Sequence, residues 1–182
     1  MVSTSLPLLT LAGGAGSGKS TIARELAAEI PGLAVIHLDD CYHDDPRLAP
    51  TVDNYDGGGQ IVNFSHPRSI DLARVDAKLA ECAEADLVLV EGLFALSLPA
   101  LRERARWSAY IDVPADIRIA RKTIRKIDEG RNPRHVLRGY LEHGREAFER
   151  HVAPTRAYAD LVLDGTAPVP DLVKQLRLLC TA

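Results

Sequence analysis

Short apolar runs alternate along the chain with segments in which apolar residues recur every three or four positions. The runs predict buried strands at about 6–12, 33–38, 87–90, 109–113 and 161–163. The segments with helical spacing predict helices at about 21–30, 69–85, 98–106, 115–129, 133–151 and 170–179. Strands that alternate with helices in this way predict a parallel sheet covered on both faces.

The predicted helix 115–129 has two contrasting sides. The side predicted to face the core carries Ile117, Ala120, Ile124 and Ile127. The opposite side carries basic residues three or four positions apart, namely Arg118, Arg121, Lys122 and Arg125. Such a stripe is either a solvated helix face or a group of cations over a transferring phosphoryl group, and the pattern leaves both open.

Residues 41–67 show no clear periodicity and contain a run of three glycines at 57–59. A loop of this length without secondary structure is usually functional in a compact domain. The sequence therefore predicts that part of a binding site lies here.

The stretch from Gly13 to Ser20 reads GGAGSGKS and fits the phosphate-binding pattern G-x-x-x-x-G-K-[ST]. A strand precedes it and a helix follows it, which is the order that the motif needs. Its glycines let successive N–H groups point inward, and the helix N-terminus favours an anion. An ordinary glycine-rich turn is the alternative, which the Lys-Ser pair and the flanking elements disfavour.

This motif predicts a site for ATP and Mg²⁺. Lys19 supplies a point charge to the β- and γ-phosphates, and the Ser20 hydroxyl is placed for Mg²⁺. The residues predicted to bind the nucleotide are Gly13, Gly14, Ala15, Gly16, Ser17, Gly18, Lys19, Ser20 and Thr21.

Acidic residues follow two of the other predicted strands, where ligands of parallel sheets bind. Glu91 ends the strand 87–90 and is predicted to hold Mg²⁺, unless it only caps the next turn. Asp39 and Asp40 end the strand 33–38, and either carboxylate could take a proton from an attacking hydroxyl. His37, just before them, is predicted to pack in the core or on the sheet rather than to act as a ligand.

The composition is that of a globular protein in one domain, residues 1–182. Hydrophobic residues make up 46% and charged residues 26% of the chain, and the net charge of −3 argues against nucleic-acid and membrane-surface binding. Charge is uneven, since residues 1–100 carry 6 Lys and Arg against 14 Asp and Glu, whereas 101–182 carry 16 against 11. The acidic residues 1–100 are suited to bind a metal ion and accept protons, and the basic residues 101–182 are suited to bind phosphate.

Cysteine spacing and hydropathy bear on the compartment. The three cysteines form no C-x-x-C pair, and we find no signal peptide and no run of about 20 apolar residues. We therefore expect a cytoplasmic protein without disulfides, zinc or membrane spans.

Six segments together resemble the uridine kinase and phosphoribulokinase family of P-loop kinases, in the same order and over nearly the whole chain. They are GGAGSGKS, LDDCYHDD, NFSHPRSID, VEGLFAL, IDVPADIRIARKTIRKIDEGR and APTRAYADLVL. The resemblance implies a three-layer P-loop NTPase fold with strand order 2-3-1-4-5. It also implies a mobile helical lid at about 118–135.

The resemblance also implies roles for individual residues. The family's catalytic base falls on Asp39, in preference to Asp40, which is left as a candidate substrate contact. Tyr42 and Phe64 match acceptor contacts. Basic positions of the lid and phosphate site fall on Arg118, expected at the substrate, and on Arg121 and Arg125, expected in catalysis.

Two departures bear on the acceptor. The family aspartate that binds ribose hydroxyls falls on Ser65, and the Tyr-Asp-Phe substrate hairpin of uridine kinases is missing. Asp53, Asp56 or Asp71 would have to replace that aspartate for a ribonucleoside to bind well.

The sequence therefore favours an ATP-dependent kinase that phosphorylates a hydroxyl of a small nucleoside-like or sugar-like acceptor. A related kinase for a pantothenate-like or phosphorylated-sugar acceptor is one alternative. A nucleotide-dependent regulatory module with little turnover is another, which Asp39 and the basic stripe disfavour. Self-association into a homo-oligomer is a hypothesis that the sequence does not decide.

Overall fold

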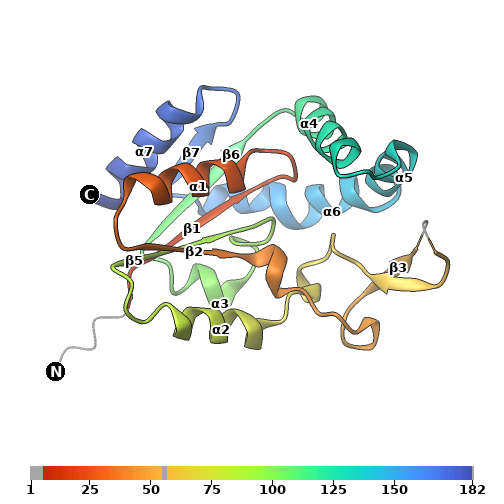
Figure 1. The fold of residues 1–182 in the computed structure, drawn as a ribbon, viewed down its shortest axis with the longest axis horizontal. Helices are drawn as coiled ribbons and strands as arrows, with labels where there is room; N and C mark the ends of the chain where they lie inside the picture. Colours follow the sequence, from red (N-terminus) through yellow and green to blue (C-terminus); the bar gives the residue numbers. More distant parts are fainter. Residues whose placement is uncertain (1–5, 55–56, 182) are drawn as a thin grey trace.

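A computed structural model describes residues 6–54 and 57–181, and a parallel sheet of five strands forms its centre (Figure 1). Its strands are β1 (Leu8–Gly13), β2 (Leu33–His37), β5 (Leu87–Glu91), β6 (Trp107–Asp112) and β7 (Leu161–Asp164). They lie in the order β2-β5-β1-β6-β7, and all neighbours are parallel. Counted within this sheet alone, the order is the predicted 2-3-1-4-5.

Helices cover both faces of the sheet. On one face lie α1 (Lys19–Glu29) and α7 (Val169–Thr181), and on the other lie α2 (Leu72–Glu81) and the short α3 (Pro99–Arg102) (Figure 1). The predicted three-layer α/β fold is therefore confirmed.

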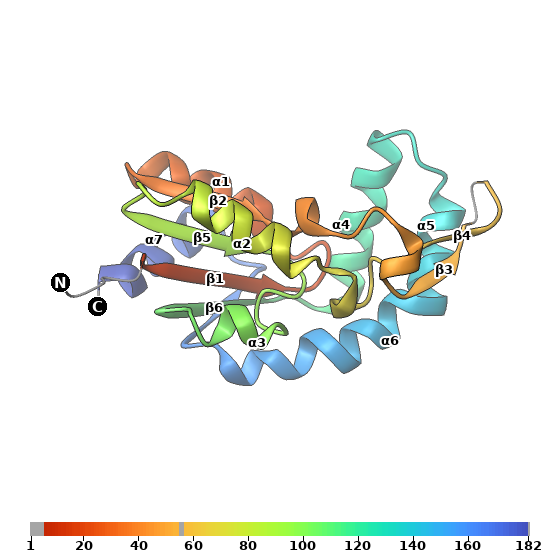
Figure 2. The ribbon, with the colours of Figure 1, turned by 90° about the horizontal axis from the view of Figure 1, so that it is seen from below.

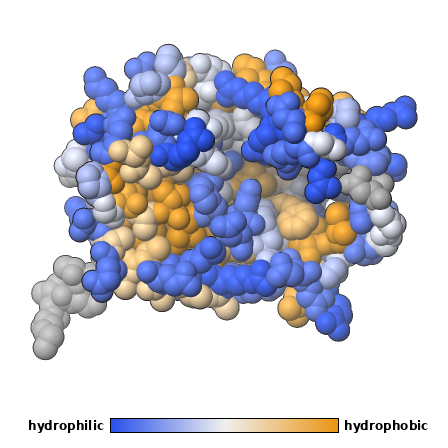
Figure 3. Space-filling view, viewed as in Figure 1, coloured by the Kyte–Doolittle hydropathy of each residue, from blue (hydrophilic) through white to orange (hydrophobic). Residues whose placement is uncertain are grey.

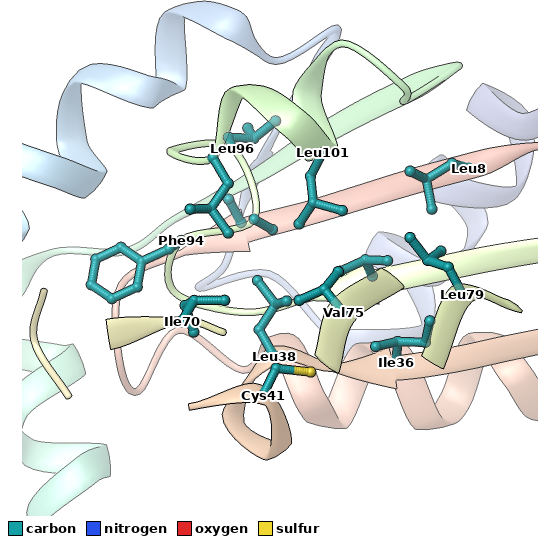
Figure 4. Close-up of a cluster of buried hydrophobic side chains, with 14 of the residues drawn as sticks. Leu8, Ile36, Leu38, Cys41, Ile70, Val75, Leu79, Phe94, Leu96 and Leu101 are labelled. Carbon is teal, nitrogen blue, oxygen red and sulfur yellow. The ribbon is translucent and has the colours of Figure 1, made fainter. Parts of the chain in front are cut away.

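Side chains of the central strands point alternately into two cores, as a period of two requires. In β1, Leu8 belongs to the core under α2 and α3, whereas Leu9 and Leu11 belong to the core under α1 and α7. Figure 4 shows part of the first core. All six residues of β1 and all five of β5 are buried, which explains why these strands read as apolar runs.

Helix α2 is shorter than the predicted helix 69–85. Asp71 caps it, because its Oδ1 accepts the amide N–H groups of Ala73 and Arg74 at 3.0 and 3.3 Å. Residues 67–69 instead form a separate turn of 3₁₀ helix.

A small hairpin interrupts the stretch 41–67, for which no secondary structure was predicted. Strand β3 (Thr51–Asp53) pairs antiparallel with β4 (Gln60–Val62), and Asp56, one of the candidate ribose ligands, lies outside the described residues. Strands of three residues are too short to show an alternating pattern. The hairpin lies beyond the end of the main sheet, on the same side as α4 (Ala115–Asp128) and α5 (Pro133–Gly139) (Figure 2).

The predicted core face of α4 is confirmed only at Ile117, which packs against the core under α1 and α7. Ile124 and Ile127 are 62% and 48% exposed, and the one buried residue of this helix is Arg118. The helix begins at the end of β6 and runs past the sheet, so no core lies under its apolar side beyond Ile117 (Figures 1 and 2). Figure 3 shows hydrophobic surface among polar side chains in the region of α4.

Gly130 follows the end of α4 and adopts the left-handed backbone conformation that often terminates helices. Its φ of +76° is left-handed, its N–H donates to Ile127, and the N–H of Arg131 donates to Lys126, each at 2.8 Å. This pair of bonds is a Schellman motif, and it sets the angle at which α5 leaves α4.

The helix predicted to end near residue 151 continues to Tyr158. After α5 it consists of π-helical turns at 140–144 and 148–152, with α6 (Arg145–Ala147) between them, and a 3₁₀ segment at 153–158. π-helical turns are often found at functional sites. None of the helices in the described residues has the length and hydropathy that spanning a bilayer requires.

We predict that Leu101→Ala lowers the free energy of unfolding by about 2–5 kcal/mol, because Leu101 is 1% exposed in the core under α3. Urea unfolding followed by circular dichroism measures this. Leu178→Ala, at a position 61% exposed, is the matched control, and an equal loss in both variants would contradict the packing described here.

Candidate active site

The phosphate-binding loop forms a cradle between β1 and α1. Gly16 and Gly18 have φ of +83° and +96°, and a Cβ on Gly16 would lie 2.2 Å from the Arg118 carbonyl oxygen. Only glycine therefore fits at position 16. The first N–H groups of α1 have no acceptor within the helix, so they can bind an anion.

Lys19 reaches back across this loop. Its Nζ donates to the Gly14 carbonyl oxygen at 3.1 Å, and the residue is 9% exposed. Burial lowers the pKa of Lys19, while the carboxylates of Glu91 and Asp39 oppose that change. The Ser17 hydroxyl under the loop has no hydrogen-bond partner among the described residues. The Lys19 ammonium, the Ser17 hydroxyl and the first N–H groups of α1 are together suited to bind a polyphosphate, because all of them can donate hydrogen bonds to phosphate oxygens.

A cavity of about 410 Å³ opens beside the loop. The sequence-predicted site residues that line it are Ala15, Gly16, Lys19, Ser20, Asp39, Tyr42, Phe64, Ser65, Glu91, Arg118 and Arg125. A smaller hollow of about 190 Å³ adjoins the loop and adds Gly18, Thr21 and Arg121. Gly13, Gly14 and Ser17 line neither space. The fold thus gathers most of the predicted residues at one end of the sheet.

The two aspartates after β2 point to different places. Asp39 lines the cavity, whereas the Asp40 carboxylate lies 3.5 Å from Lys78 of α2 and its side chain is 59% exposed. Residues 38–41 form a 3₁₀ turn, so neighbouring side chains diverge. The structure therefore does not bring Asp40 to the cavity that the predicted acceptor contacts Tyr42, Phe64 and Ser65 line.

His37, which was predicted to pack in the core or on the sheet, lies in strand β2 of the sheet, and its ring is hydrogen-bonded to Glu91. His37 and Glu91 are register partners at the ends of β2 and β5, and Nδ1 of the histidine lies 2.6 Å from Oε1 of Glu91. The histidine side chain is 44% exposed, whereas that of Glu91 is 5% exposed. This bond orients the Glu91 carboxylate. It could not be predicted from the sequence, because the sequence does not show which residues of β2 and β5 lie side by side.

The oxygens of Ser20 and Glu91 suit Mg²⁺, a hard cation that prefers oxygen ligands. No group of three or more His, Cys, Asp or Glu within residues 6–54 and 57–181 could hold a metal ion. A cation here would therefore depend on one or two protein oxygens together with phosphate and water, which is the usual mode of Mg²⁺ at nucleotide sites.

An aromatic pair, Tyr42 and Phe64, forms part of the cavity wall. The Tyr42 hydroxyl donates to the Phe64 carbonyl oxygen at 2.9 Å, and the two rings meet edge to face at 5.0 Å. Burial raises the pKa of Tyr42. Because its hydroxyl is already engaged, Tyr42 fixes the position of Phe64, which is 53% exposed. Ser65 follows it on the same wall.

Arg118 lines the cavity, but its contacts are with the protein itself. Its Nε donates to the Val113 carbonyl oxygen at 3.0 Å, and its Cζ lies 3.8 Å from the centre of the Phe148 ring. A Cβ on Gly14 would lie 2.4 Å from Nη1 of Arg118. Burial lowers the pKa of Arg118. The side chain thus joins the phosphate loop to α4 and to the helical segment 133–158, a role that its expected place at the substrate did not include.

Two further basic residues of α4, Arg121 and Arg125, line the smaller hollow beside the phosphate loop. Arg121 donates from Nη1 to the Gly165 carbonyl oxygen at 3.1 Å and lines only the smaller hollow. Arg125 lines both spaces and lies 3.6 Å from Glu129.

Lys122 was not among the predicted site residues, although it lines both spaces. Burial lowers its pKa, and so do Lys126 and Arg125. Lys122 belongs to the basic stripe of this helix, so the sequence pattern could have identified it as a site residue. Residues from the segment 133–158 were also missed, namely Tyr140, Gly144, Ala147 and Phe148, because no motif marks them.

Comparisons with known proteins agree with this geometry. The family model described as "Phosphoribulokinase / Uridine kinase family" matches residues 71–170. A uridine kinase of Deinococcus deserti is 32% identical over 184 residues, covering 86% of each chain. A uridine kinase of Brevibacillus brevis is 28% identical and covers 86% of this chain and 83% of its own.

Two solved structures share the fold. A protein from Silicibacter sp. TM1040, described as a "putative fructose transport system kinase", has a TM-score of 0.63 at 22% identity, covering 88% of this chain and 91% of its own. A protein from Bacillus stearothermophilus, described as a possible uridine kinase, has a TM-score of 0.53 at 16% identity, covering 90% and 91%.

We predict that Arg118→Met lowers the free energy of unfolding by about 2–4 kcal/mol, because it removes a buried charged hydrogen bond and the contact with Phe148. Thermal and urea unfolding measure the loss. Arg121→Met, which removes one contact of an exposed arginine on the same helix, should lose clearly less. Equal losses would show that Arg118 does not join these segments.

Proposed function

Since the chain belongs to the phosphoribulokinase and uridine kinase family, we propose that it is an ATP-dependent kinase that phosphorylates a hydroxyl of a small sugar-like or nucleoside-like acceptor. One observation carries the proposal. A phosphate-binding loop with Lys19, a strand-end acid at Glu91 and a second acid at Asp39 line one cavity, and the aromatic Phe64 forms part of its wall. A module that only binds a nucleotide needs neither the second acid nor that wall.

In this proposal the loop N–H groups and Lys19 would hold the phosphates of ATP, and the oxygens of Ser20 and Glu91 would hold Mg²⁺. ATP would supply the γ-phosphoryl group, and bound Mg²⁺ would offset part of its negative charge. His37 keeps the Glu91 carboxylate turned toward the site through their hydrogen bond. Such an outer contact orients a ligand without touching the metal.

Asp39 is the proposed general base. The acceptor oxygen forms a bond to the γ-phosphorus as the bond from that phosphorus to the bridging oxygen of ADP breaks, and the hydroxyl proton passes to Asp39. Lys122 and Arg125 place positive charge beside the transferring group, where it stabilises charge in the transition state.

We propose that the segment 118–135 acts as a lid. It carries the basic side chains, runs past the sheet and changes direction at the Schellman motif of Gly130. Closure over bound nucleotide would bring Lys122 and Arg125 nearer the phosphates and exclude water.

The test is ADP release with ATP and a panel of nucleosides, ribosides, sugars and small alcohols. Lys19→Ala is the control, because no other residue of the loop carries a positive charge. Turnover with at least one acceptor, abolished by Lys19→Ala, supports the proposal. Acceptor-independent ATP hydrolysis, or wild-type turnover in the variant, contradicts it.

We predict that Asp39→Asn lowers kcat by about 10²–10⁴-fold and leaves ATP affinity nearly unchanged, because the amide keeps the volume but cannot accept the proton. Steady-state kinetics and ATP titration measure the two quantities. Asp40→Asn is the matched control, since Asp40 faces Lys78 instead of the cavity. A larger loss of kcat in the Asp40 variant than in the Asp39 variant would contradict the assignment of Asp39 as the general base.

We also predict that uridine and cytidine are poor acceptors, although the relatives named above are uridine kinases. A carboxylate can accept hydrogen bonds from two ribose hydroxyls, each worth about 1.5–3 kcal/mol, whereas Ser65 offers one uncharged hydroxyl. Asp71 cannot replace it because it caps α2. A micromolar KM for uridine would refute this prediction, whereas uridine activity gained by Ser65→Asp would support it.

A further inference from the structure

The acceptor side of the cavity is built from loops and not from the main sheet. Asp39 and Tyr42 come after the end of β2. Phe64 and Ser65 come after the end of β4. The hydrogen bonds of the parallel strands therefore do not fix these side chains, and other contacts hold them on the cavity wall.

Backbone hydrogen bonds tie the first of these loops to the segment before α2. The N–H of His43 donates to the Ser69 carbonyl oxygen at 2.9 Å. The N–H of Asp71 donates to the Cys41 carbonyl oxygen at 2.8 Å. Cys41 is fully buried in the core that Figure 4 shows, so the loop is anchored to the core on one side of Tyr42.

Tyr42 lies between these bonds, opposite Ile70 in an antiparallel bridge. In a pair of this kind the N–H and C=O groups of the central residue point away from its partner. The Tyr42 carbonyl oxygen therefore needs a donor from elsewhere, and it accepts a hydrogen bond from Nη1 of Arg74 at 2.8 Å. Tyr42 is buried, so an unpaired carbonyl oxygen there would be costly.

Two carboxylates hold the guanidinium group of Arg74 in turn. Its Nη2 lies 2.5 Å from Oδ2 of Asp44, and its Nε lies 3.4 Å from Oδ2 of Asp71, the residue that caps α2. A planar fork of donors can contact a carbonyl oxygen and two carboxylates at once. Arg74 therefore joins the first turn of α2 to the loop that carries Asp39 and Tyr42.

Arg74 lines neither space of the active site, so any effect that it has on the acceptor is indirect. That effect passes through Tyr42, whose hydroxyl donates to the Phe64 carbonyl oxygen and whose ring packs edge to face on Phe64. A shift of Tyr42 would therefore move an expected acceptor contact.

We propose that Arg74 is a positioning residue for the acceptor, which holds Tyr42 and, through Tyr42, Phe64 in place on the cavity wall. This inference rests on the proposed kinase function and assigns a role to a residue that no motif of the sequence marks. The contacts of Arg74 are with the loop after β2 and with α2, whereas the phosphate loop lies between β1 and α1. ATP binding should therefore not depend on Arg74.

The first test compares the KM of the acceptor with the KM of ATP in Arg74→Met, which removes every donor of the side chain. The acceptor is whichever of ribose, glycerol, pantothenate and uridine gives the highest kcat/KM with the wild-type protein. We expect the acceptor KM to rise about tenfold and the ATP KM to stay within about twofold. A loss of folded protein alone would lower kcat and leave both KM values unchanged, so an unchanged acceptor KM would overturn the inference.

Two further variants separate positioning from charge and from stability. Arg74→Lys keeps the positive charge but not the fork of donors, so its acceptor KM should also rise, by about fivefold or more. Arg104→Met removes an exposed ion pair of 2.6 Å with Asp76 of α2, and its acceptor KM should stay within about twofold of the wild-type value. A wild-type KM in the lysine variant, or an equal rise in the Arg104 variant, would overturn the inference.

Amide hydrogen exchange tests the positioning without any turnover. In Arg74→Met the amides of His43 and Asp71, which make the bonds on either side of Tyr42, should exchange about tenfold faster, and Arg104→Met should leave them unchanged. Faster exchange in Arg74→Met, with no turnover of any acceptor by the wild-type protein, would refute the kinase function and uphold the role of Arg74 in holding this loop. Unchanged exchange in Arg74→Met would overturn the inference and leave the kinase function standing.

Discussion

The burial of β1 between β5 and β6 is the constraint on which the site depends. All six of its residues are buried and its neighbours run parallel to it, so the phosphate loop must emerge at the edge where the other strands also end. The same alignment makes His37 and Glu91 register partners at that edge. Because the strands are held by backbone bonds and two packed cores, these side chains have little freedom to move apart. The position of the site is therefore a consequence of the sheet.

Arg118 links this rigid part to the rest of the molecule. It is the one buried residue of α4, and its guanidinium group lies between the loop glycines and the Phe148 ring. An arginine suits this place because it can donate to Val113 and stack on an aromatic ring at once. Beyond it, α4 has no core beneath it, and Ile124 and Ile127 are exposed. A helix fixed at its first turns and free of the core further on is suited to movement over a site.

The acidic first part and the basic second part of the sequence contribute different charged residues to the same cavity. Asp39 and Glu91 come from the acidic first part of the chain, and the cations of α4 and the following turn come from the basic second part. The fold brings members of both groups to the wall of one cavity. Acids near Lys19 offset part of the cost of its burial, and the charge of Asp39 likewise opposes the lowering of the pKa of Lys122 by burial.

The sequence by itself determined the parallel sheet, the phosphate loop and the strand-end acids, because apolar runs and the G-x-x-x-x-G-K-S spacing are local properties of the chain. It did not determine which face of α4 is buried, since its spacing is the same whether or not a core lies beneath the helix. The His37–Glu91 bond, the separation of Asp39 from Asp40 and the contribution of Tyr140 and Phe148 were decided by the tertiary structure alone. Each depends on strand register, on the direction of a side chain in a 3₁₀ turn, or on contact between segments far apart in the chain. None of these is a local property of the sequence.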